Sequence, residues 1–257
     1  MSFINTQNSY LYYDFFATDI TTSSPVKTIL LLHGFAGTPE SDFAGQLPPL
    51  RQHYNVLAPH LHGYGRSSQR TTYTPTYYRE DVEDMRALLD SLDLSQVLVL
   101  AFSDGAIVGL LLAALHPERV TALAIHGAQP TITTENVTSI RQWLLEKPLS
   151  EEWQAQLAQL HGEPYWRSLP GMYVEAQEKL VAAGGVLITN EELAAIRCPI
   201  LIMHGRRDRV VLVHYAYTLH ERIPQSRLLL FNAGHAAHLR CEQEYNEAII
   251  GFFHTAK

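Results

Sequence analysis

Cysteine is scarce in this sequence, which contains only Cys198 and Cys241 among 257 residues. Two cysteines cannot form the disulfide framework of a small secreted domain, and this pair offers no metal-ligand motif. The first ten residues, MSFINTQNSY, also lack the basic and apolar segments of a signal peptide. These absences favour a cytoplasmic protein.

Excess positive charge and long apolar runs are missing as well. Acidic residues outnumber basic ones 26 to 19, which gives a net charge of −7. Binding to nucleic acid or to an anionic membrane surface relies on clustered basic residues, so we expect neither partner. The longest strongly apolar stretch, AIVGLLLAAL, is much shorter than a membrane-spanning helix. With 46% hydrophobic residues, the chain is instead typical of a globular protein.

Short apolar runs alternate with helical patterns along most of the chain. In residues 74–92 the apolar side chains recur every three or four positions, which predicts a helix with one buried face. Residues 104–115 are apolar nearly all round, so this helix is expected to be fully buried. Strand patterns occupy residues 3–5, 9–16, 28–35, 55–61, 96–102, 120–127, 198–205 and 226–233, and further helical patterns occupy 39–50, 210–223 and 241–253.

The alternation stops between residues 128 and 190, where three helical patterns follow one another and all three tryptophans lie. Strands that alternate with helices imply a mostly parallel sheet covered on both faces. We therefore expect an α/β fold with a central sheet of about eight strands flanked by helices. The core domain would comprise residues 1–127 and 191–257, with a helical cap at 128–190 inserted after the sixth strand.

The segment VLVLAFSDGAIVGLL places Ser103 between the end of a buried strand and the start of a buried helix. This is the context of a nucleophile elbow, in which a strained turn raises the serine hydroxyl above the sheet edge. The turn needs small neighbours, and Ala101 and Gly105 flank it, with alanine at the position that usually holds glycine. The alternative is a serine that only caps the helix, since Ser is a preferred N-cap residue.

Partners for Ser103 follow two later strands. Asp208 lies in the loop after residues 198–205, and no carboxylate follows the strand at 120–127, the other position for such an acid. Taken alone, Asp208 is more typical of a helix N-cap. His235 follows the last strand pattern; His238 is the rival base, but it is expected to begin the final helix.

A glycine loop follows the strand in LLLHGFAG. There the backbone N–H of Phe35 is expected to face the reacting carbonyl, together with the N–H of Asp104 at the start of the next helix. Two such donors form an oxyanion hole, and each typically contributes a few kcal/mol to transition-state stabilisation.

The order Ser103, Asp208, His235 is the triad order of α/β-hydrolases. Over essentially its whole length the chain resembles this superfamily, within its group of capped esterases, lactonases and C–C bond hydrolases. The S-D-G elbow also resembles that of valacyclovir-hydrolase-like members. The segment APHLHGYGRSS is similar to the family's D-x-x-G-x-G-x-S loop, with His60 in place of Asp. The resemblance implies that this loop shapes the surroundings of the active site.

His60 and His62 are the only pattern in that loop that suggests a metal. No carboxylate or thiol lies near them in the sequence to complete a site, so we expect no metal. The roles of the two histidines stay open.

These residues predict a serine hydrolase that needs no cofactor and forms an acyl-enzyme on a small-molecule ester. A serine nucleophile disfavours the dehalogenase and epoxide-hydrolase branches, which the resemblance implies would carry Asp. Cleavage of a C–C bond in a β-diketone-type substrate, of a lactone or of an amide is the alternative on the same triad. A ligand-binding receptor or vestigial hydrolase is the alternative of another class. The chain is expected to be a monomer or homodimer.

The cap is expected to roof the substrate pocket. It has no cluster of Arg or Lys to select an anionic substrate, so a small to medium, largely apolar ester is predicted. For each cap aromatic, holding the cap together is the competing explanation. The predicted lining residues are Phe102, Trp143, Trp166, Tyr173 and His238.

Overall fold

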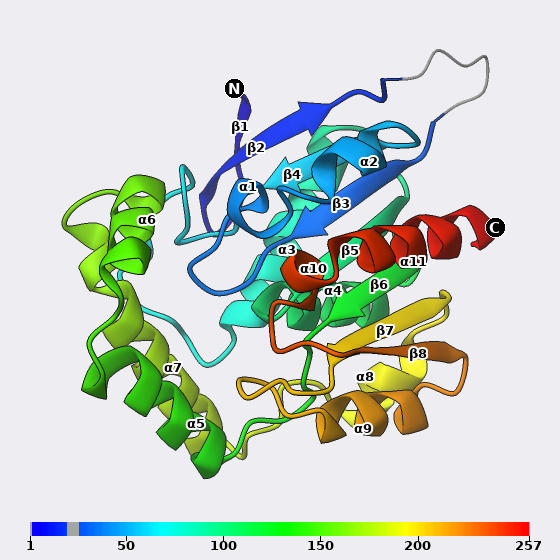
Figure 1. Cartoon of the computed structure of the whole chain (residues 1–257). Helices are drawn as coiled ribbons and strands as arrows, with labels where there is room; N and C mark the ends of the chain where they lie inside the picture. The colour runs from blue at the N-terminus through cyan, green and yellow to red at the C-terminus, as the bar shows by residue number, and fades with distance from the viewer. Residues whose placement is uncertain (1, 20–25, 257) are drawn as a thin grey trace.

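The computed structural model describes residues 2–19 and 26–256, which build an eight-stranded sheet covered by helices (Figure 1). The strand order is β1-β2-β4-β3-β5-β6-β7-β8. The pairs β1–β2 and β2–β4 are antiparallel and all others are parallel, so the predicted mostly parallel sheet is confirmed. The strands are β1 (Ser2–Asn5), β2 (Tyr10–Phe16), β3 (Thr28–Leu32), β4 (Asn55–Pro59), β5 (Val97–Phe102), β6 (Val120–His126), β7 (Ile200–Gly205) and β8 (Ser226–Phe231).

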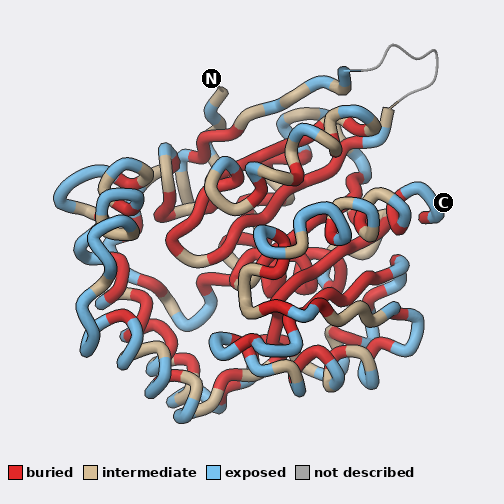
Figure 2. The backbone as a smooth tube through the Cα atoms, in the orientation of Figure 1, coloured by how far each residue is buried: buried red, intermediate tan, exposed pale blue. Residues whose placement is uncertain are grey.

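Two apolar layers cover the sheet because successive side chains of a strand point to opposite faces. Leu30 and Leu32 of β3 belong to the layer under α3, α4, α8 and α9. Ile29 and Leu31 belong to the opposite layer, under α2 and α11. Figure 2 shows the buried strands between these layers. The core helices are α1 (Pro39–Asp42), α2 (Leu47–Arg51), α3 (Tyr77–Ser91), α4 (Asp104–Leu115), α8 (Asn190–Ala195), α9 (His214–Arg222), α10 (Ala237–Arg240) and α11 (Glu242–Thr255).

Helix α4 is buried from Asp104 to Ala114, as its uniformly apolar pattern predicts. The helix expected over residues 210–223 begins only at His214, which corrects that prediction. The backbone N–H groups of Val210 and Val211 donate to the Asp208 carboxylate, so this part of the chain forms a loop that turns toward Asp208.

A helical cap is inserted after β6 and stands to one side of the core (Figure 1). Its two ends lie together, since Ile132 N donates to Gly185 O at 2.7 Å and Leu187 N donates to Pro130 O at 3.0 Å. The boundaries 128 and 190 themselves stay a prediction. The cap elements are α5 (Thr134–Arg141), the π-helical turn η1 (Gln142–Glu146), α6 (Glu151–His161), the 3₁₀ turn η2 (Tyr165–Arg167) and α7 (Leu169–Ala182).

No helix that the structure describes is long and apolar enough to span a lipid bilayer.

Candidate active site

Ser103 occupies a sharp turn between β5 and α4. Its backbone has φ +53° and ψ −121°, a strained combination for a residue with a side chain. A Cβ atom on Gly105 would lie 2.3 Å from the carbonyl oxygen of Leu32, so only glycine lets α4 cross the end of β3. Strained geometry of this kind is characteristic of a side chain that is held in place for chemistry.

The structure also shows how alanine fits at position 101. A Cβ atom on Gly109 would lie 3.2 Å from the Ala101 Cβ, so Gly109 leaves space for the Ala101 methyl group. Gly109, one turn after Gly105 in α4, therefore provides the space that a glycine at position 101 would otherwise leave.

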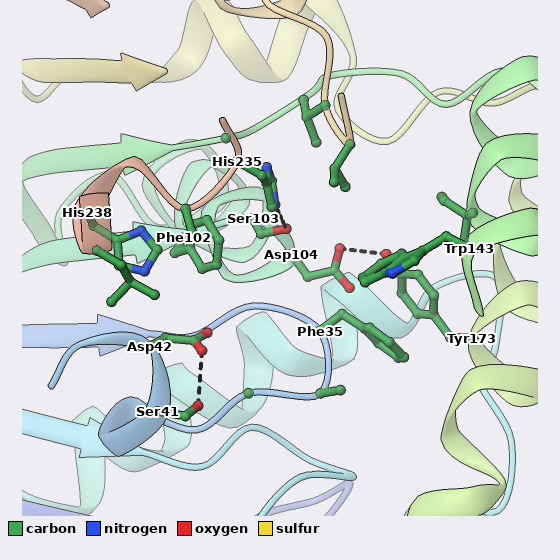
Figure 3. A pocket seen from close by; sticks show the side chains of 18 of the residues that line it. Phe35, Ser41, Asp42, Phe102, Ser103, Asp104, Trp143, Tyr173, His235 and His238 are labelled. Atoms are coloured by element: carbon green, nitrogen blue, oxygen red, sulfur yellow. Dashed lines mark hydrogen bonds between the residues drawn. The ribbon is translucent and has the colours of Figure 1, made fainter. Parts of the chain in front are cut away.

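Ser103, His235 and Asp208 form a hydrogen-bonded chain. The Ser103 Oγ lies 3.0 Å from His235 Nε2, and His235 Nδ1 lies 2.7 Å from Asp208 Oδ2. Figure 3 shows His235 pointing toward Ser103. With Nδ1 protonated and donating to the carboxylate, Nε2 is left to accept the Ser103 proton.

Asp208 is held rigidly, which orients the His235 ring in turn. Its side chain is buried, and its Oδ1 accepts the N–H groups of Val210 and Val211 at 2.8 and 2.9 Å. His204 at the end of β7 lies behind it, with Nε2 2.8 Å from the Val211 oxygen and 3.3 Å from Asp208 Oδ2. His204 is not among the residues predicted from the sequence, because a histidine inside a strand pattern does not indicate what its ring contacts.

Phe35 and Asp104 line the same cavity as Ser103, and their backbone N–H groups have no hydrogen-bond acceptor in the described part of the chain. The Phe35 amide is close to Ser103, since a Cβ on the preceding Gly34 would lie 3.1 Å from the Ser103 Cβ. Two backbone N–H groups without acceptors beside a strained serine are able to donate hydrogen bonds to a developing oxyanion.

A cavity of about 330 Å³ opens above Ser103, within the usual range of small-ligand sites. Phe102, Trp143, Tyr173 and His238 line it, together with Trp153, whose ring stacks on Trp143 with centroids 5.2 Å apart. In Figure 3, Trp143 and Tyr173 approach from the cap side.

Trp166 is not among the lining residues, contrary to expectation. It packs with Ala36 and Leu157 in a separate apolar cluster between the cap and the core. The competing explanation for cap aromatics, packing of the cap itself, therefore describes this tryptophan.

Two carboxylates also line the cavity, which makes it less apolar than predicted. Asp104 Oδ1 accepts the hydroxyl groups of Tyr78 and Tyr173 at 3.0 and 2.9 Å, while its buried Oδ2 has no partner among the described residues. Burial raises the pKa of Asp104 to about 6, although the two tyrosines oppose the shift. The sequence predicts a role for the backbone N–H of this residue but none for its side chain.

The second carboxylate, Asp42, ends helix α1. Its Oδ2 accepts the Gly34 N–H at 2.8 Å and its Oδ1 accepts the Ser41 hydroxyl at 3.0 Å (Figure 3). Burial raises the pKa of Asp42 to about 6. Asp42 is not among the residues predicted from the sequence, because its segment has only a weak helical pattern.

His238 lies in the short helix α10 rather than at the start of the final helix. Its Nδ1 is 3.3 Å from the Nδ1 of His126, and Phe102 lies between its ring and Ser103 (Figure 3). Burial lowers the pKa of His238 to about 4, which keeps the ring neutral. His238 contributes to the cavity wall, whereas His235 contacts the serine.

His60 links its own loop to helix α1 near the site. Its Nδ1 accepts the Arg66 N–H at 2.9 Å, and its Nε2 lies 3.0 Å from the Glu40 carboxylate. This arrangement agrees with the shaping role that the family resemblance implies.

His62 has carboxylates nearby in space, although not in sequence. Its ring and the carboxylates of Asp81 and Asp84 in α3 have ligand atoms within 4.8 Å of one another. The Arg70 guanidinium already pairs with Asp81, and Asp84 accepts hydrogen bonds from residues 6, 8 and 9. A cationic side chain, two hydroxyl groups and one side-chain amide thus already compensate these charges.

Residues 27–160 match the family model described as alpha/beta hydrolase fold. Human serine hydrolase BPHL is 30% identical over 233 residues, which cover 87% of this chain and 78% of the human protein. The chain belongs to the α/β-hydrolase family.

Two further proteins are similar to this chain, one in sequence and one in structure. The 2-hydroxy-6-oxo-6-(2'-aminophenyl)hexa-2,4-dienoic acid hydrolase of Metapseudomonas resinovorans is 22% identical, over 88% of this chain and 83% of its own. The enol-lactonase of Burkholderia xenovorans LB400 superposes with a TM-score of 0.77 at 18% identity, over 98% of this chain and 99% of that chain. The second likeness concerns the fold alone.

Proposed function

We propose that this protein is a serine hydrolase that cleaves a small to medium carboxylic ester through an acyl-enzyme. One observation carries the proposal: the strained Ser103 is hydrogen-bonded to His235, which is hydrogen-bonded to the buried Asp208. A serine that only caps a helix needs neither the strain nor the histidine.

The proposed reaction begins when His235 Nε2 takes the Ser103 proton and Oγ attacks the carbonyl carbon. The N–H groups of Phe35 and Asp104 stabilise the oxyanion, and Asp208 stabilises the charged imidazole. His235 then protonates the leaving alcohol. Water, activated by the same histidine, attacks the acyl-enzyme and releases the acid. No step requires a cofactor or a metal.

The residues that line the cavity limit the range of substrates that can bind. The stacked Trp143 and Trp153 and the Phe35 ring offer apolar surface at the cap side. Asp42 and Asp104 disfavour a substrate with an anionic group, because like charges repel strongly where water is excluded. A neutral ester with an apolar group of modest size fits this lining.

Hydrolysis of a C–C bond, a lactone or an amide uses the same triad and is the second candidate. The named acid substrate of the M. resinovorans relative is anionic, and the two carboxylates here speak against such a molecule. A ligand-binding receptor with a vestigial site is the third candidate, and the short Ser103–His235 contact speaks against it.

Intact-mass analysis after incubation with a fluorophosphonate tests the proposed nucleophile without knowledge of the substrate. We expect a single adduct on the wild type, none on Ser103→Ala, and strongly slowed labelling of His235→Ala. His238→Ala is the matched control, because its ring lines the same cavity without contacting Ser103. Absence of an adduct on folded wild-type protein would contradict the proposal.

A panel of substrates then identifies the type of bond that the enzyme cleaves. Neutral p-nitrophenyl esters of increasing chain length are compared with an anionic hemisuccinate ester, a lactone, an anilide and a β-diketone. We expect the short and medium neutral esters to have the highest kcat/KM. Faster turnover of the diketone, lactone or anilide would favour the second candidate.

A further inference from the structure

One cap residue contacts the loop that contains the proposed oxyanion donor Phe35. His161 is the last residue of α6, and its side chain is buried. Its Nε2 lies 2.9 Å from the carbonyl oxygen of Ala36, and its Nδ1 accepts the Gly65 N–H at 2.9 Å. One ring therefore connects the cap with two separate loops of the core.

The protonation state of the His161 ring follows from these two contacts. Nδ1 faces an N–H group, so it must be the unprotonated nitrogen, and Nε2 carries the hydrogen that is donated to Ala36 O. Burial lowers the pKa of His161, which favours this neutral form. Both ring nitrogens are engaged.

The turn that receives this hydrogen bond is strained. Residues 34–37 form a tight turn in which Gly37 N donates to Gly34 O at 3.2 Å. Ala36 has φ +55°, in the left-handed region that residues with a side chain rarely adopt. Such a conformation persists only where the surroundings hold it. Asp42 holds the start of the turn at Gly34 N, and His161 holds the end at Ala36 O.

We infer that His161 is a positioning residue for the oxyanion hole: through its hydrogen bond to Ala36 O, the docked cap sets the orientation of the Phe35 amide. The catalytic consequence rests on the proposed function, whereas the conformational one does not. Cap docking and the geometry of the oxyanion hole are then coupled through this hydrogen bond, in addition to the packing of Trp166 on Ala36 and the stacking of Tyr173 on the Phe35 ring.

Tyr165 provides a matched control from the same part of the cap. Its hydroxyl donates to Gly63 O at 2.9 Å and accepts the Arg70 N–H at 3.0 Å. Tyr165 thus ties the cap to the same core loop as His161 does at Gly65, but it makes no hydrogen bond to the turn at residues 34–37. Tyr165→Phe reports on cap docking alone.

Amide hydrogen exchange tests the conformational part without any turnover. We expect peptides that span residues 33–37 to exchange at least about tenfold faster in His161→Phe, because the strained turn opens more often. The same peptides are expected to be unchanged in Tyr165→Phe. Unchanged exchange in His161→Phe would overturn the inference, whatever the enzyme hydrolyses.

Kinetics on an ester substrate tests the catalytic part. In His161→Phe we expect kcat to fall by about 10- to 100-fold with KM within about threefold, because the lost interaction acts on the transition state. Affinity for a trifluoromethyl ketone, whose adduct with Ser103 places an oxyanion in the hole, should fall by the same factor. Tyr165→Phe should keep both values within about twofold.

His161→Gln separates the hydrogen bond from packing. Its amide nitrogen reaches the position of Nε2, so this variant should recover most of the lost kcat. Equal losses in the glutamine and phenylalanine variants would count against the donated hydrogen bond. If wild-type protein hydrolyses no ester but exchange at residues 33–37 still depends on His161, the proposed function fails and the positioning role stands.

Discussion

At the scale of single residues, hydrogen bonds decide which similar side chains can take part in chemistry. His235 and His238 are three positions apart, yet one contacts Ser103 and the other contacts His126. Asp208 and Asp104 both follow buried strands closely, yet one contacts a histidine and the other two tyrosines. Residue type alone does not separate these pairs.

The Asp208 carboxylate selects the tautomer of His235. Asp208→Asn is expected to lower kcat by about 10³- to 10⁴-fold, because an amide can hold the ring with the wrong nitrogen protonated. Ester kinetics and the rate of fluorophosphonate labelling measure this effect. Asp14→Asn, a change in β2 outside the cavity, serves as the control. Activity within tenfold of wild type would argue against Asp208 as the triad acid.

The raised pKa of Asp104 predicts how stability varies with pH. Between the unfolded value near 4 and the folded value of about 6, the native protein binds more protons than the unfolded chain. This residue therefore lowers the free energy of unfolding as pH rises through that window. Asp104→Asn removes this effect. The free energy of unfolding of the variant minus that of the wild type should therefore be on the order of 3 kcal/mol larger at pH 7.5 than at pH 3.

Urea unfolding of both proteins at several pH values measures this difference. A constant or opposite difference would show that the buried carboxylate is not destabilised by ionisation.

At the scale of elements, the site depends on how closely α4 approaches the ends of β3 and β5. Gly105 passes against the backbone of Leu32 and His33, and Gly109 faces Ala101. Local sequence patterns predict the strands and the helix. The distance between α4 and the two strands, in contrast, is set by how these elements pack.

Gly105→Ala should lower the free energy of unfolding by about 2–3 kcal/mol, because its methyl group meets backbone oxygens that cannot rotate away. It should also displace Ser103 and slow fluorophosphonate labelling. Gly251→Ala in α11 is the matched control, since a methyl group there meets nothing within 4 Å. That change should stabilise the protein by about 0.5–1 kcal/mol. Thermal and urea unfolding measure the stability of both variants. Equal changes in the free energy of unfolding for Gly105→Ala and Gly251→Ala would contradict the packing argument.

At the scale of the whole molecule, the cap and core meet around the site. Tyr173 and Gln177 of α7 donate to Asp104 and Tyr77 of the core, and His161 donates to Ala36. The cap therefore completes the cavity and also satisfies polar groups of the core.

The adjacent ends of the cap predict that the core folds without it. A chain in which a short Gly-Ser linker replaces residues 133–184 should keep a mixed α/β circular dichroism spectrum and unfold cooperatively. Its melting temperature should be lower than that of the wild type, because cap residues such as Leu169 and Leu180 pack into the apolar layer under α3, α4, α8 and α9. Loss of cooperative unfolding would show that the core requires the cap, and the proposed boundaries would then not mark an independent unit.

Local sequence patterns are enough to predict the α/β fold, the cap after the sixth strand, and Ser103, Asp208 and His235 as candidates. Strand and helix periodicities are local, and strand ends in a parallel sheet gather at one edge, so the order of motifs already indicates which side chains meet.

Contacts between distant segments follow from the tertiary packing and not from local patterns. Trp166 packs under the cap instead of lining the cavity, Asp42 joins its wall, and His161 reaches Ala36 from 125 residues away. These outcomes depend on how the helices of the cap and of the core pack against their neighbours. Packing energy summed over the whole interface sets that arrangement, and no local pattern encodes it.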